Sequence, residues 1–559
     1  MPRWEAGAVT AALLLAASTG TPAEGPRRLA LLDEPILVLR MADGSLTGWL
    51  VQGPDGAQAV CRRASTDNGQ TWSAAETVCA LPGGPGRWLG LEPLLDREGE
   101  VHLFLLRYGQ EGTVGAGEGE RVLVGELVDT RLDLWATRSH EGQSRWDKPR
   151  MLWKGYTGAL NSVAQLDSGR ILLPFSYLTS RTWANRGTGL DEWTFMGQFD
   201  CVNVYSDDGG ESWALSASLR TPVPDIVSAY GAVEPVVIQL RDGRVWMLIR
   251  TQQGRLYESF SPDGAQWSAP QPTELLSSDS PVGIVRLGDG RLVLLWNNCL
   301  RFPYAYGGRH VLHAAISDDE GKTWRGFREV ARDPRRNEPP PPNGDFGTAY
   351  PFPTATGDGQ VIYCTGQGAG RVLLMRLCPD WLLERRQTAD FFGRTEEWHH
   401  FGTRGVGFAQ HPRRPRATVL SLCKTDPHWP AAVTWNFPSG RSGRLKIRLM
   451  PRPGCRPLLL GLTDHFSVPF DLEDHLNSLY NLRLGAGCVE VAEGQWHDVI
   501  LAWDEHARRC EVTVDGRPAG PLHLRRETLG ACYVRLRSLA EDVDTAGWLV
   551  EAVTVEVGP

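Results

Sequence analysis

The sequence predicts an all-β protein in which a six-bladed β-propeller is followed by a β-sandwich (jelly-roll) domain. Three observations predict it: a composition rich in Trp (21), Gly (62) and Pro (38), a Trp-containing turn that is repeated, and a hairpin pattern repeated upstream of it. Aromatic residues interspersed with Gly and Pro are typical of strands joined by tight turns. A chain of 559 residues is too long for one compact core, so at least two domains are expected.

A turn of the form Ser-x-Asp-x-Gly-x-Thr-Trp recurs along the chain. Clear copies span 65–72, 206–213 and 317–324, a shorter copy spans 261–267, and a degenerate copy at 139–146 has Glu141 at the Asp position. The Asp carboxylate can accept hydrogen bonds from nearby backbone N–H groups, and Gly permits a positive φ. The Trp ring can pack on the hairpin. We therefore interpret the turn as structural and not as catalytic.

A strand, a Gly-containing turn and a second strand occur six times. The copies span residues 35–51, 93–108, 162–177, 235–250, 281–296 and 351–363. Their apolar alternation is typical of β-hairpins. Six hairpins, five of them followed by the Trp turn, indicate six four-stranded units, and radial closure of such units makes a propeller. A flat solenoid is the alternative. We place this domain at residues 28–385.

The pattern changes at about residue 390. Strand-like segments include 444–449, 496–503 and 511–516, and the last two combine a Trp-His-x-Val strand with a Val-Asp-Gly hairpin. This combination resembles the concanavalin-like β-sandwiches of jelly-roll lectins, so residues 390–559 are expected to form a lectin-like accessory domain. The resemblance implies carbohydrate binding. The alternative is a sandwich that only covers the propeller.

The N-terminus has the features of an export signal. Arg3 precedes an apolar run over residues 8–17, and small residues follow as far as Ala23. Residues 1–23 are therefore predicted to be a signal peptide, and the protein is expected to be secreted or periplasmic. A buried helix is the alternative. Neither this run nor a later segment has the length of a mature membrane span.

The remaining composition narrows the expected partners. The formal net charge of −8 argues against nucleic acid, because phosphate binding needs a basic face. The 11 cysteines and 13 histidines show no CxxC, HExxH or other metal-ligand spacing, so we expect no metal and no cofactor. Most cysteines are expected to be small buried residues, with one or two disulfides.

The Trp turns resemble the Asp-boxes, or BNR repeats, of sialidases, and the resemblance covers about residues 30–380. It implies a Tyr nucleophile assisted by a Glu, an Asp acid/base and three arginines that bind the sialate carboxylate. An Arg fork matches a carboxylate, and a neutral Tyr is not repelled by an anionic anomeric centre. Because Asp-boxes also occur in other propellers, activity has to be argued from individual residues.

The segment from Glu234 to Arg250 resembles the family most closely. It reads Glu-Pro-x-x-x-x-Leu-x-Asp-Gly and then reaches Arg250. The resemblance implies that Glu234 is the base for the Tyr and that Arg250 is one of the carboxylate-binding arginines. A surface Glu and a strand-end Arg are the alternative.

Two further roles follow from the resemblance. Arg309 lies eight residues before Ser317 of a Trp turn, a spacing similar to that of a second substrate-binding Arg, and Arg301 competes for this role. Tyr350 opens the last hairpin and resembles the nucleophile, with Tyr230 as the reserve candidate. An aromatic side chain packed at the blade edge is the alternative for Tyr350.

The first hairpin departs from the family pattern. Glu34 stands where the family has an Arg, and its carboxylate would repel a sialate carboxylate at close range. Asp55 lies about where the family's Asp precedes the first Trp turn and is the candidate general acid, with an ordinary Asp-Gly turn as the alternative. Glu92 and Asn161 occupy positions equivalent to Glu234 and are expected to bind substrate at the tunnel mouth. Strand-end polar groups in solvent are the alternative.

These residues predict an exo-acting glycoside hydrolase that releases a terminal acidic sugar, first of all an exo-α-sialidase acting on a sialoside or other glycoconjugate. Tyr350 attacks with Glu234 as its base, and Asp55 protonates the leaving oxygen. Arg250 and Arg309 hold the carboxylate. Because the first-blade Arg is missing, a hydrolase of the same scaffold acting on a different terminal sugar is the second hypothesis. A non-catalytic glycan- or protein-binding propeller is the third.

Overall fold

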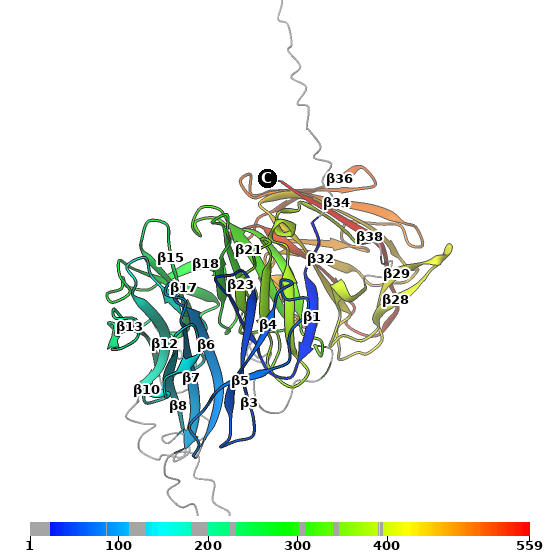
Figure 1. Ribbon diagram of the computed structural model, residues 1–559. Coiled ribbons are helices and arrows are strands. Elements are labelled where there is room, and N and C mark those ends of the chain that lie inside the picture. The colour runs from blue at the N-terminus through cyan, green and yellow to red at the C-terminus, as the bar shows by residue number, and fades with distance from the viewer. Residues whose placement is uncertain are drawn as a thin grey trace, which may run out of the picture.

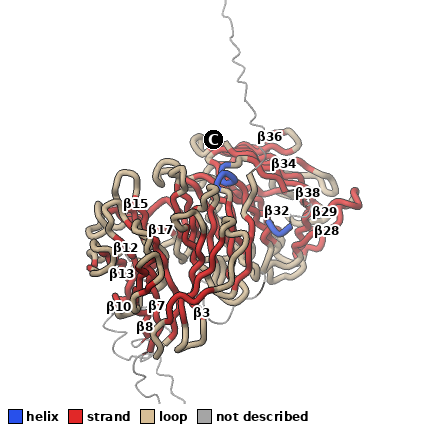
Figure 2. The backbone as a smooth tube through the Cα atoms, viewed as in Figure 1, coloured by secondary structure: helices blue, strands red, loops and turns tan. Residues whose placement is uncertain are grey.

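The computed structural model describes residues 23–84, 86–110, 130–179, 198–222, 231–300, 308–336, 338, 346–389, 391 and 395–558. Strands account for the regular structure of these ranges apart from short 3-10 helices (Figure 2). The helices are η3 (Pro379–Leu383), η4 (Thr395–Glu397) and η5 (Asp474–Leu476). The predicted all-β class is therefore confirmed.

Strands β1 to β25 form six antiparallel sheets. The first sheet contains β2 (Leu37–Arg40), β3 (Leu46–Gln52), β4 (Ala59–Ser65) and β5 (Glu76–Ala80). The second contains β6 (Arg87–Leu95), β7 (Val101–Gln110), β8 (Thr130–His140) and β10 (Arg150–Trp153), with β9 (Arg145–Trp146) beside β8. The third contains β11 (Ala164–Gln165), β12 (Ile171–Thr179), β13 (Gln198–Ser206) and β14 (Ala214–Leu215).

The other three sheets follow the same order. The fourth contains β15 (Val233–Gln239), β16 (Val245–Arg250), β17 (Arg255–Ser261) and β18 (Gln271–Leu276). The fifth contains β19 (Gly283–Arg286), β20 (Leu292–Trp296), β21 (Val311–Ser317) and β22 (Arg325–Arg332). The sixth contains β23 (Phe352–Ala355), β24 (Val361–Thr365), β25 (Val372–Leu377) and β1 (Arg27–Leu32). The six predicted hairpins are confirmed, each as an antiparallel pair.

The six sheets contact one another in sequence order and close into a ring (Figure 1). β2 contacts β6, β12 contacts β15, β15 contacts β19, and β19 contacts β23. The second and third sheets share a core that contains Phe104 and Phe175. Finally β23 contacts β2, so the sixth sheet lies against the first.

An N-terminal strand completes the sixth sheet. β1 pairs antiparallel with β25, from Arg27 opposite Arg376 to Leu32 opposite Val372. The last sheet is thus built from both ends of this part of the chain. Strand hydrogen bonds join these ends and protect the edge of the sheet. The hairpin repeat does not predict this pairing, because the partners lie far apart in the sequence.

The Trp turns make the hydrogen bonds that their chemistry predicts. Asp319 accepts from Thr323 N (2.8 Å) and Thr323 Oγ1 (2.6 Å). Ser317 Oγ donates to Asp319 (2.8 Å) and accepts from Gly321 N (2.9 Å). The same bonds recur at 65–72 and 206–213. In three copies the Trp indole N–H donates to the Gly carbonyl at 3.1 Å.

In the degenerate turn at 139–146, a carboxylate from another hairpin takes the place of the missing Asp. Ser139 Oγ and Gly142 N both donate to Glu100, from the loop between β6 and β7. Glu141 bonds through its carbonyl, which accepts from Ser144 Oγ (3.0 Å). The turn therefore keeps a central carboxylate although its own Asp is absent.

Two sheets make up the C-terminal part. The eight-stranded sheet contains β28 (Val406–His411), β29 (Arg414–Lys424), β38 (Asp544–Val557), β31 (Ser442–Pro451), β34 (His497–Asp504), β35 (Arg509–Val514) and β36 (Arg517–His523), with β26 (Arg386–Ala389) beside β38. The five-stranded sheet contains β27 (Trp398–His399), β30 (Ala432–Gly440), β37 (Ala531–Ser538), β32 (Leu458–Thr463) and β33 (Tyr480–Leu484).

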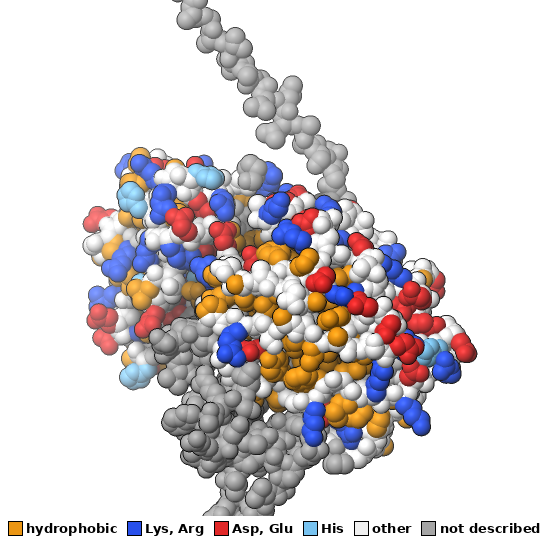
Figure 3. Space-filling view, turned by 90° about the vertical axis from the view of Figure 1, so that its left-hand side faces the viewer, with side chains coloured by type: hydrophobic (Ala, Val, Ile, Leu, Met, Phe, Trp, Pro, Cys, Tyr) orange, Lys and Arg blue, Asp and Glu red, His pale blue; other side chains and the backbone are white. Residues whose placement is uncertain are grey.

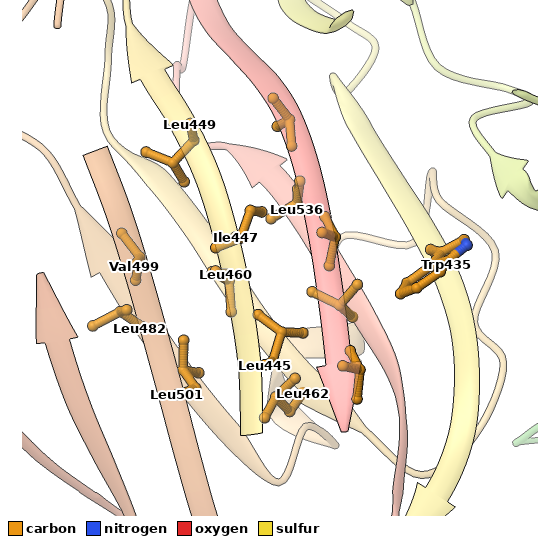
Figure 4. Close-up of a cluster of buried hydrophobic side chains, with 14 of the residues drawn as sticks. Trp435, Leu445, Ile447, Leu449, Leu460, Leu462, Leu482, Val499, Leu501 and Leu536 are labelled. Carbon is orange, nitrogen blue, oxygen red and sulfur yellow. The ribbon is translucent and has the colours of Figure 1, made fainter. Parts of the chain in front are cut away.

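The two C-terminal sheets enclose one hydrophobic core (Figure 4). Leu445 and Leu501 from the larger sheet and Leu460 and Leu536 from the smaller one are fully buried in it. Alternate residues of each strand supply these side chains, as two packed sheets require. The C-terminal part is therefore the predicted two-layer sandwich.

The sandwich packs on the fifth sheet, where β22 contacts β30. Glu329 of β22 is buried there. It accepts hydrogen bonds from Tyr533 Oη (2.6 Å) and Arg332 Nε (2.7 Å), and its carboxylate lies 2.8 Å from His399 Nε2. Burying a carboxylate without hydrogen-bond partners is unfavourable in free energy. These bonds therefore fix the position of the sandwich relative to the fifth sheet.

The cysteines do not form the expected disulfides. All 11 are described, and none is paired. Six of them are buried and serve as small apolar residues. The prediction of one or two disulfides is therefore wrong.

Two further predictions concern membranes and nucleic acid. The described ranges contain no helix that is long and apolar enough to cross a membrane. Residues 1–22 of the predicted signal peptide lie outside the described residues.

On the face shown in Figure 3, acidic and basic side chains are interspersed, whereas a surface that binds nucleic acid needs one continuous basic area.

Replacing Asp319 tests the structural role of the Trp turn. Asp319→Ala removes the acceptor of the Thr323 and Ser317 bonds, so the free energy of unfolding should fall by about 1–2 kcal/mol. Urea denaturation measures this change. The control is Asp318→Ala, because Asp318 is exposed and forms a surface ion pair with Arg325 (2.7 Å). It should change stability by less than about 0.5 kcal/mol. Equal effects of the two variants would contradict a special role for Asp319.

Candidate active site

The candidate residues lie at one recurring position of the ring. The residue before each predicted hairpin is, in chain order, Glu34, Glu92, Asn161, Glu234, Ser280 and Tyr350. Since the hairpins occupy the same place in successive sheets, these six positions are equivalent around the ring. Of the six, Glu234 (φ 48°) and Tyr350 (φ 56°) have a positive φ. Such a backbone conformation is strained for a residue with a side chain and is concentrated at functional sites.

Tyr350, Glu234 and Arg250 contact one another directly. Tyr350 Oη donates to Glu234 Oε1 (2.9 Å), and Arg250 Nη1 donates to Tyr350 Oη (3.2 Å) and to Glu234 Oε2. All three side chains are buried. A phenol O–H is thus placed against a carboxylate that can accept its proton, with a guanidinium beside both oxygens. These are three of the residues that the family resemblance selected.

The third sheet holds Glu234 in place. Ala159 N donates to Glu234 Oε1 (3.1 Å), and Ser176 Oγ accepts from Glu234 N (3.2 Å). Asn161 Nδ2 donates to the carbonyls of Ala159 (3.4 Å) and Glu234 (3.5 Å). A Cβ at Gly158 would come within 3.3 Å of Glu234 Cγ. Asn161 therefore positions the backbone around Glu234.

Arg309 lies over the Tyr350 ring. Its Cζ is 5.7 Å from the ring centroid, and its guanidinium donates to Gln367 Oε1 (3.0 Å) and to the Asp279 carbonyl (2.9 Å). The Asp279 carboxylate accepts from Arg250 Nε (2.8 Å) and Gln252 Nε2 (3.0 Å). Asp279 therefore joins the two candidate arginines.

A cavity of about 620 Å³ opens beside Tyr350 and Glu234. Much of its wall is apolar, and its polar or amphipathic lining side chains are Glu34, Gln52, Gln58, Arg87, Trp88, Tyr156, Glu234, Tyr350 and Gln367. This volume is typical of sites for small ligands. The candidate nucleophile and its base thus face a space that can hold a sugar.

The first and second sheets supply the charged rim of this cavity. Arg87 lies 3.7 Å from Glu34 Oε1 and 3.6 Å from Asp55 Oδ1. Asp55 is on an exposed loop, beside the lining residue Gly53 and outside the lining itself. Glu34 and Arg87 both line the cavity.

Glu92 is buried away from this cavity. It does not belong to the lining residues, and within the described part of the chain no hydrogen bond reaches its Oε2. Burial raises the pKa of the Glu92 carboxyl to about 8, because desolvation disfavours the charged form.

The candidates Arg301 and Tyr230 lie outside the described residues. Within the described ranges, no group of His, Cys, Asp and Glu side chains is arranged to hold a metal.

Comparisons with known proteins agree with this architecture. Residues 93–363 match the model of the BNR repeat-like domain family. A curated sialidase from Micromonospora viridifaciens is 25% identical over 317 residues, which cover 51% of this chain and 43% of that protein. Residues 93–363 of the chain are therefore similar to the BNR/sialidase superfamily. The chain spans less than half of that relative's length.

Solved sialidase structures are similar to the chain at low identity. The sialidase of Trypanosoma rangeli is 13% identical, with 94% of this chain and 91% of that chain covered and a TM-score of 0.41. The NanB sialidase of Streptococcus pneumoniae is also 13% identical, with 64% and 70% covered and a TM-score of 0.43.

The sandwich contacts the ring of six sheets next to Arg309. His310 stacks on Phe401 with ring centroids 5.1 Å apart, and it also contacts Phe466. Phe466 N donates to the Asn298 carbonyl (2.9 Å). These contacts hold both ends of the segment that carries Arg309, so the sandwich supports the site from outside.

Three residues of the site were not predicted from the sequence: Asp279, Gln367 and Arg87. Asp279 directly precedes Ser280, the ring position of the fifth sheet, and Gln367 follows β24. Arg87 begins β6. Asp279 could have been noticed from its place beside the hairpin position. No local pattern singles out Gln367 and Arg87, since their relevance arises from contacts across the ring.

The raised pKa of Glu92 predicts how the free energy of unfolding depends on pH. Between its ordinary value of 4.5 and about 8, the folded protein keeps a proton that the unfolded chain loses. The free energy of unfolding should therefore fall as the pH rises through this window, by up to about 1.4 kcal/mol per pH unit. Glu92→Gln should remove this slope. Urea unfolding at pH 5, 6.5 and 8 measures it. The control Glu98→Gln, at the exposed turn of the same hairpin, should leave the slope as in the wild type. An unchanged slope in Glu92→Gln would refute the assignment.

Proposed function

We propose that the chain is an exo-acting glycoside hydrolase that removes a terminal acidic sugar, with a sialoside as substrate and Tyr350 as nucleophile. The observation that carries the proposal is the contact of Tyr350 Oη with Glu234 (2.9 Å) and Arg250 (3.2 Å) at the wall of the cavity. Similarity to a sialidase over 317 residues supports the same reaction class.

In the first step, Tyr350 Oη bonds to the anomeric carbon while Glu234 accepts the phenol proton. The bond from the anomeric carbon to the leaving oxygen breaks, and that oxygen takes a proton. Arg250 stabilises negative charge on the phenol oxygen during the transfer, because its N–H already points at this atom. The backbone strain at both residues is consistent with a preorganised pair.

In the second step, water attacks the anomeric carbon, and the bond to Tyr350 Oη breaks. The proton held by Glu234 returns to the phenol oxygen. Asp55 is our candidate for the group that protonates the leaving oxygen and then deprotonates the water. It lies on an exposed loop beside the cavity and is 3.6 Å from Arg87. Two displacements at the same carbon retain the anomeric configuration.

The type of nucleophile favours an acidic sugar. A neutral phenol can approach an anomeric carbon that bears a carboxylate, whereas an ionised Asp or Glu would be repelled. Arg250 and Arg309 place two positive charges around Tyr350. Glu34 in the cavity lining favours the second candidate function, hydrolysis of a different terminal sugar on the same scaffold.

Replacing the nucleophile tests the proposal. Tyr350→Phe should lower kcat/KM by at least about 100-fold on an aryl sialoside, because the attacking oxygen is lost. Release of the aryl alcohol measures the rate. The control is Tyr363→Phe, which removes a buried phenol of the sixth sheet that donates to the Val330 carbonyl of the fifth sheet (2.7 Å). It should reduce stability and leave kcat/KM nearly unchanged.

Two results would reject the proposal. Full activity of Tyr350→Phe would exclude the nucleophile, and absence of turnover by the wild type on a panel of aryl glycosides would exclude a hydrolase. Binding of a glycan without turnover, unaffected by Glu234→Gln, would instead support a non-catalytic propeller.

The role of Asp55 has its own test, based on the leaving group. Asp55→Asn should slow hydrolysis of a sialyl-lactose substrate by about 10²–10⁴-fold. It should slow the 4-nitrophenyl sialoside by less than about tenfold, because a good leaving group needs little protonation. The ratio of the two rates is the measurement. Equal loss on both substrates would show that Asp55 is not the general acid.

A further inference from the structure

The hairpin of β28 and β29 projects from the sandwich on the side away from the ring (Figure 1). Its tip reads His-Pro-Arg-Arg-Pro-Arg over residues 411–416. Arg413 and Arg416 are exposed there, and within the described residues neither side chain forms a hydrogen bond or an ion pair. A short run that is this rich in arginine is typical of surfaces that bind polyanions.

The tip of the hairpin folds over the outer face of the eight-stranded sheet. His411 at the end of β28 stacks on Trp496, which precedes β34, with ring centroids 5.2 Å apart. This contact crosses the sheet, because β29, β38 and β31 lie between β28 and β34. Trp496 also packs against a small hydrophobic cluster of Val419, Met450 and Leu549. The hairpin is therefore anchored to the sheet and holds its arginines in a fixed place.

His411 also organises the arginines of the tip. Its Nδ1 accepts from the backbone N–H groups of Arg413 and Arg414, both at 3.0 Å. Burial lowers the pKa of this imidazole, and so do the nearby guanidinium groups of Arg414, Arg413 and Arg448. The imidazole is thus neutral near pH 7, and the positive charge of the tip comes from its arginines.

Strand β31 adds two cations to the same face. Lys446 and Arg448 alternate along this strand with the core residues Leu445, Ile447 and Leu449. Because successive side chains of a strand point to opposite faces, both cations point away from the core of the sandwich. Their side chains are 49% and 41% exposed.

Two carboxylates pair with these cations. Glu551 accepts from Arg448 Nε (2.6 Å) and forms an ion pair with Arg414. Asp498 accepts from Arg448 Nη1 (3.0 Å) and lies 2.8 Å from Lys446 Nζ. The positive charges exceed these two negative ones, although the formal net charge of the whole chain is −8. We call this surface the cationic face, and its members are Arg413, Arg414, Arg416, Lys446 and Arg448.

We infer that the cationic face binds a sulfated polysaccharide. A guanidinium presents a fork of N–H donors that matches the oxygens of an anionic group. The cations are spread over a hairpin tip and a strand, so a polymer with many sulfate groups can contact several of them at once, whereas one small anion cannot. This site lies in the other domain from Tyr350, and the inference does not depend on the proposed reaction.

Two other polyanions match the cationic face less well. A basic segment attaches stably to a membrane when an apolar anchor or an acyl chain accompanies it, and residues 411–416 include no Leu, Ile, Val, Phe or Trp. Nucleic acid needs a continuous basic surface, whereas Glu551 and Asp498 interrupt this one. Lipid vesicles and DNA therefore serve as comparison ligands.

The test measures the affinity of the full chain for heparin at several salt concentrations. The wild type should bind at about 0.15 M salt. The double variant Arg413→Gln/Arg416→Gln should bind at least about tenfold more weakly. The slope of log Kd against log salt concentration should become shallower by about one for each arginine removed. The Tm should not change, because both side chains lack partners in the described chain.

The matched control is Arg483→Gln/Arg517→Gln, which removes the same charge. These arginines are exposed on β33 and β36, and among the described residues their side chains form no hydrogen bond or ion pair. β36 is at the opposite edge of the sheet from β28. The control should bind heparin as the wild type does. An equal loss in the control would overturn the inference, since it would show an effect of net charge alone. Unchanged affinity in the Arg413→Gln/Arg416→Gln variant, or no binding by the wild type, would overturn it as well.

The class of ligand has its own comparison. Desulfated heparin should bind at least about tenfold more weakly than heparin, because its anionic groups have been removed. Equal or tighter binding of vesicles of phosphatidylserine and phosphatidylcholine, or of duplex DNA, would overturn the assignment to a polysaccharide. None of these measurements involves turnover, so failure of the proposed hydrolase and failure of this inference are distinguishable.

Discussion

The pairing of β1 with β25 closes the ring on which the site depends. Arg27 to Leu32 add the last strand to a sheet whose other strands lie more than 300 residues away in the chain. With the ring closed, β23 lies against β2, and Tyr350 on the sixth sheet faces the same cavity as Glu34 on the first. Tyr350 also reaches Glu234 on the fourth sheet, across 116 positions of sequence. The proposed nucleophile and its base meet because six similar sheets are arranged in a circle.

Rigid surroundings hold that contact in place. Glu234 is fixed from the third sheet by Ala159 and Ser176. The sandwich supports the segment around Arg309 through Phe401 and Phe466. Strained backbone at a reacting group persists only where packing over-determines it. The second domain therefore supports the candidate site, whether or not it binds carbohydrate itself.

Charge balance decides which groups can take part in recognition. Arg87 lies beside the acids Glu34 and Asp55, and Arg250 pairs with the acids Glu234 and Asp279. The buried Arg250 and Arg309 donate their hydrogen bonds to protein groups: Arg250 to the carboxylates of Glu234 and Asp279, and Arg309 to Gln367 and the Asp279 carbonyl. These bonds stabilise the site in the absence of a ligand. Arg87 at the cavity keeps its donors free.

The sequence by itself determined the repeating units. Hairpin alternation and the Trp turn depend on residues within a few positions of one another, so their pattern is visible locally, and the family resemblance added Glu234, Arg250, Arg309 and Tyr350. Only the tertiary structure decided that β1 completes the sixth sheet and that Asp279 joins two arginines. It alone showed that Glu92 is buried apart from the cavity while Arg87 lies within it. Each of these features depends on contacts between residues of different sheets. The burial and the charge interactions that stabilise them arise only when the ring is closed, so the spacing of residues along the sequence cannot predict them.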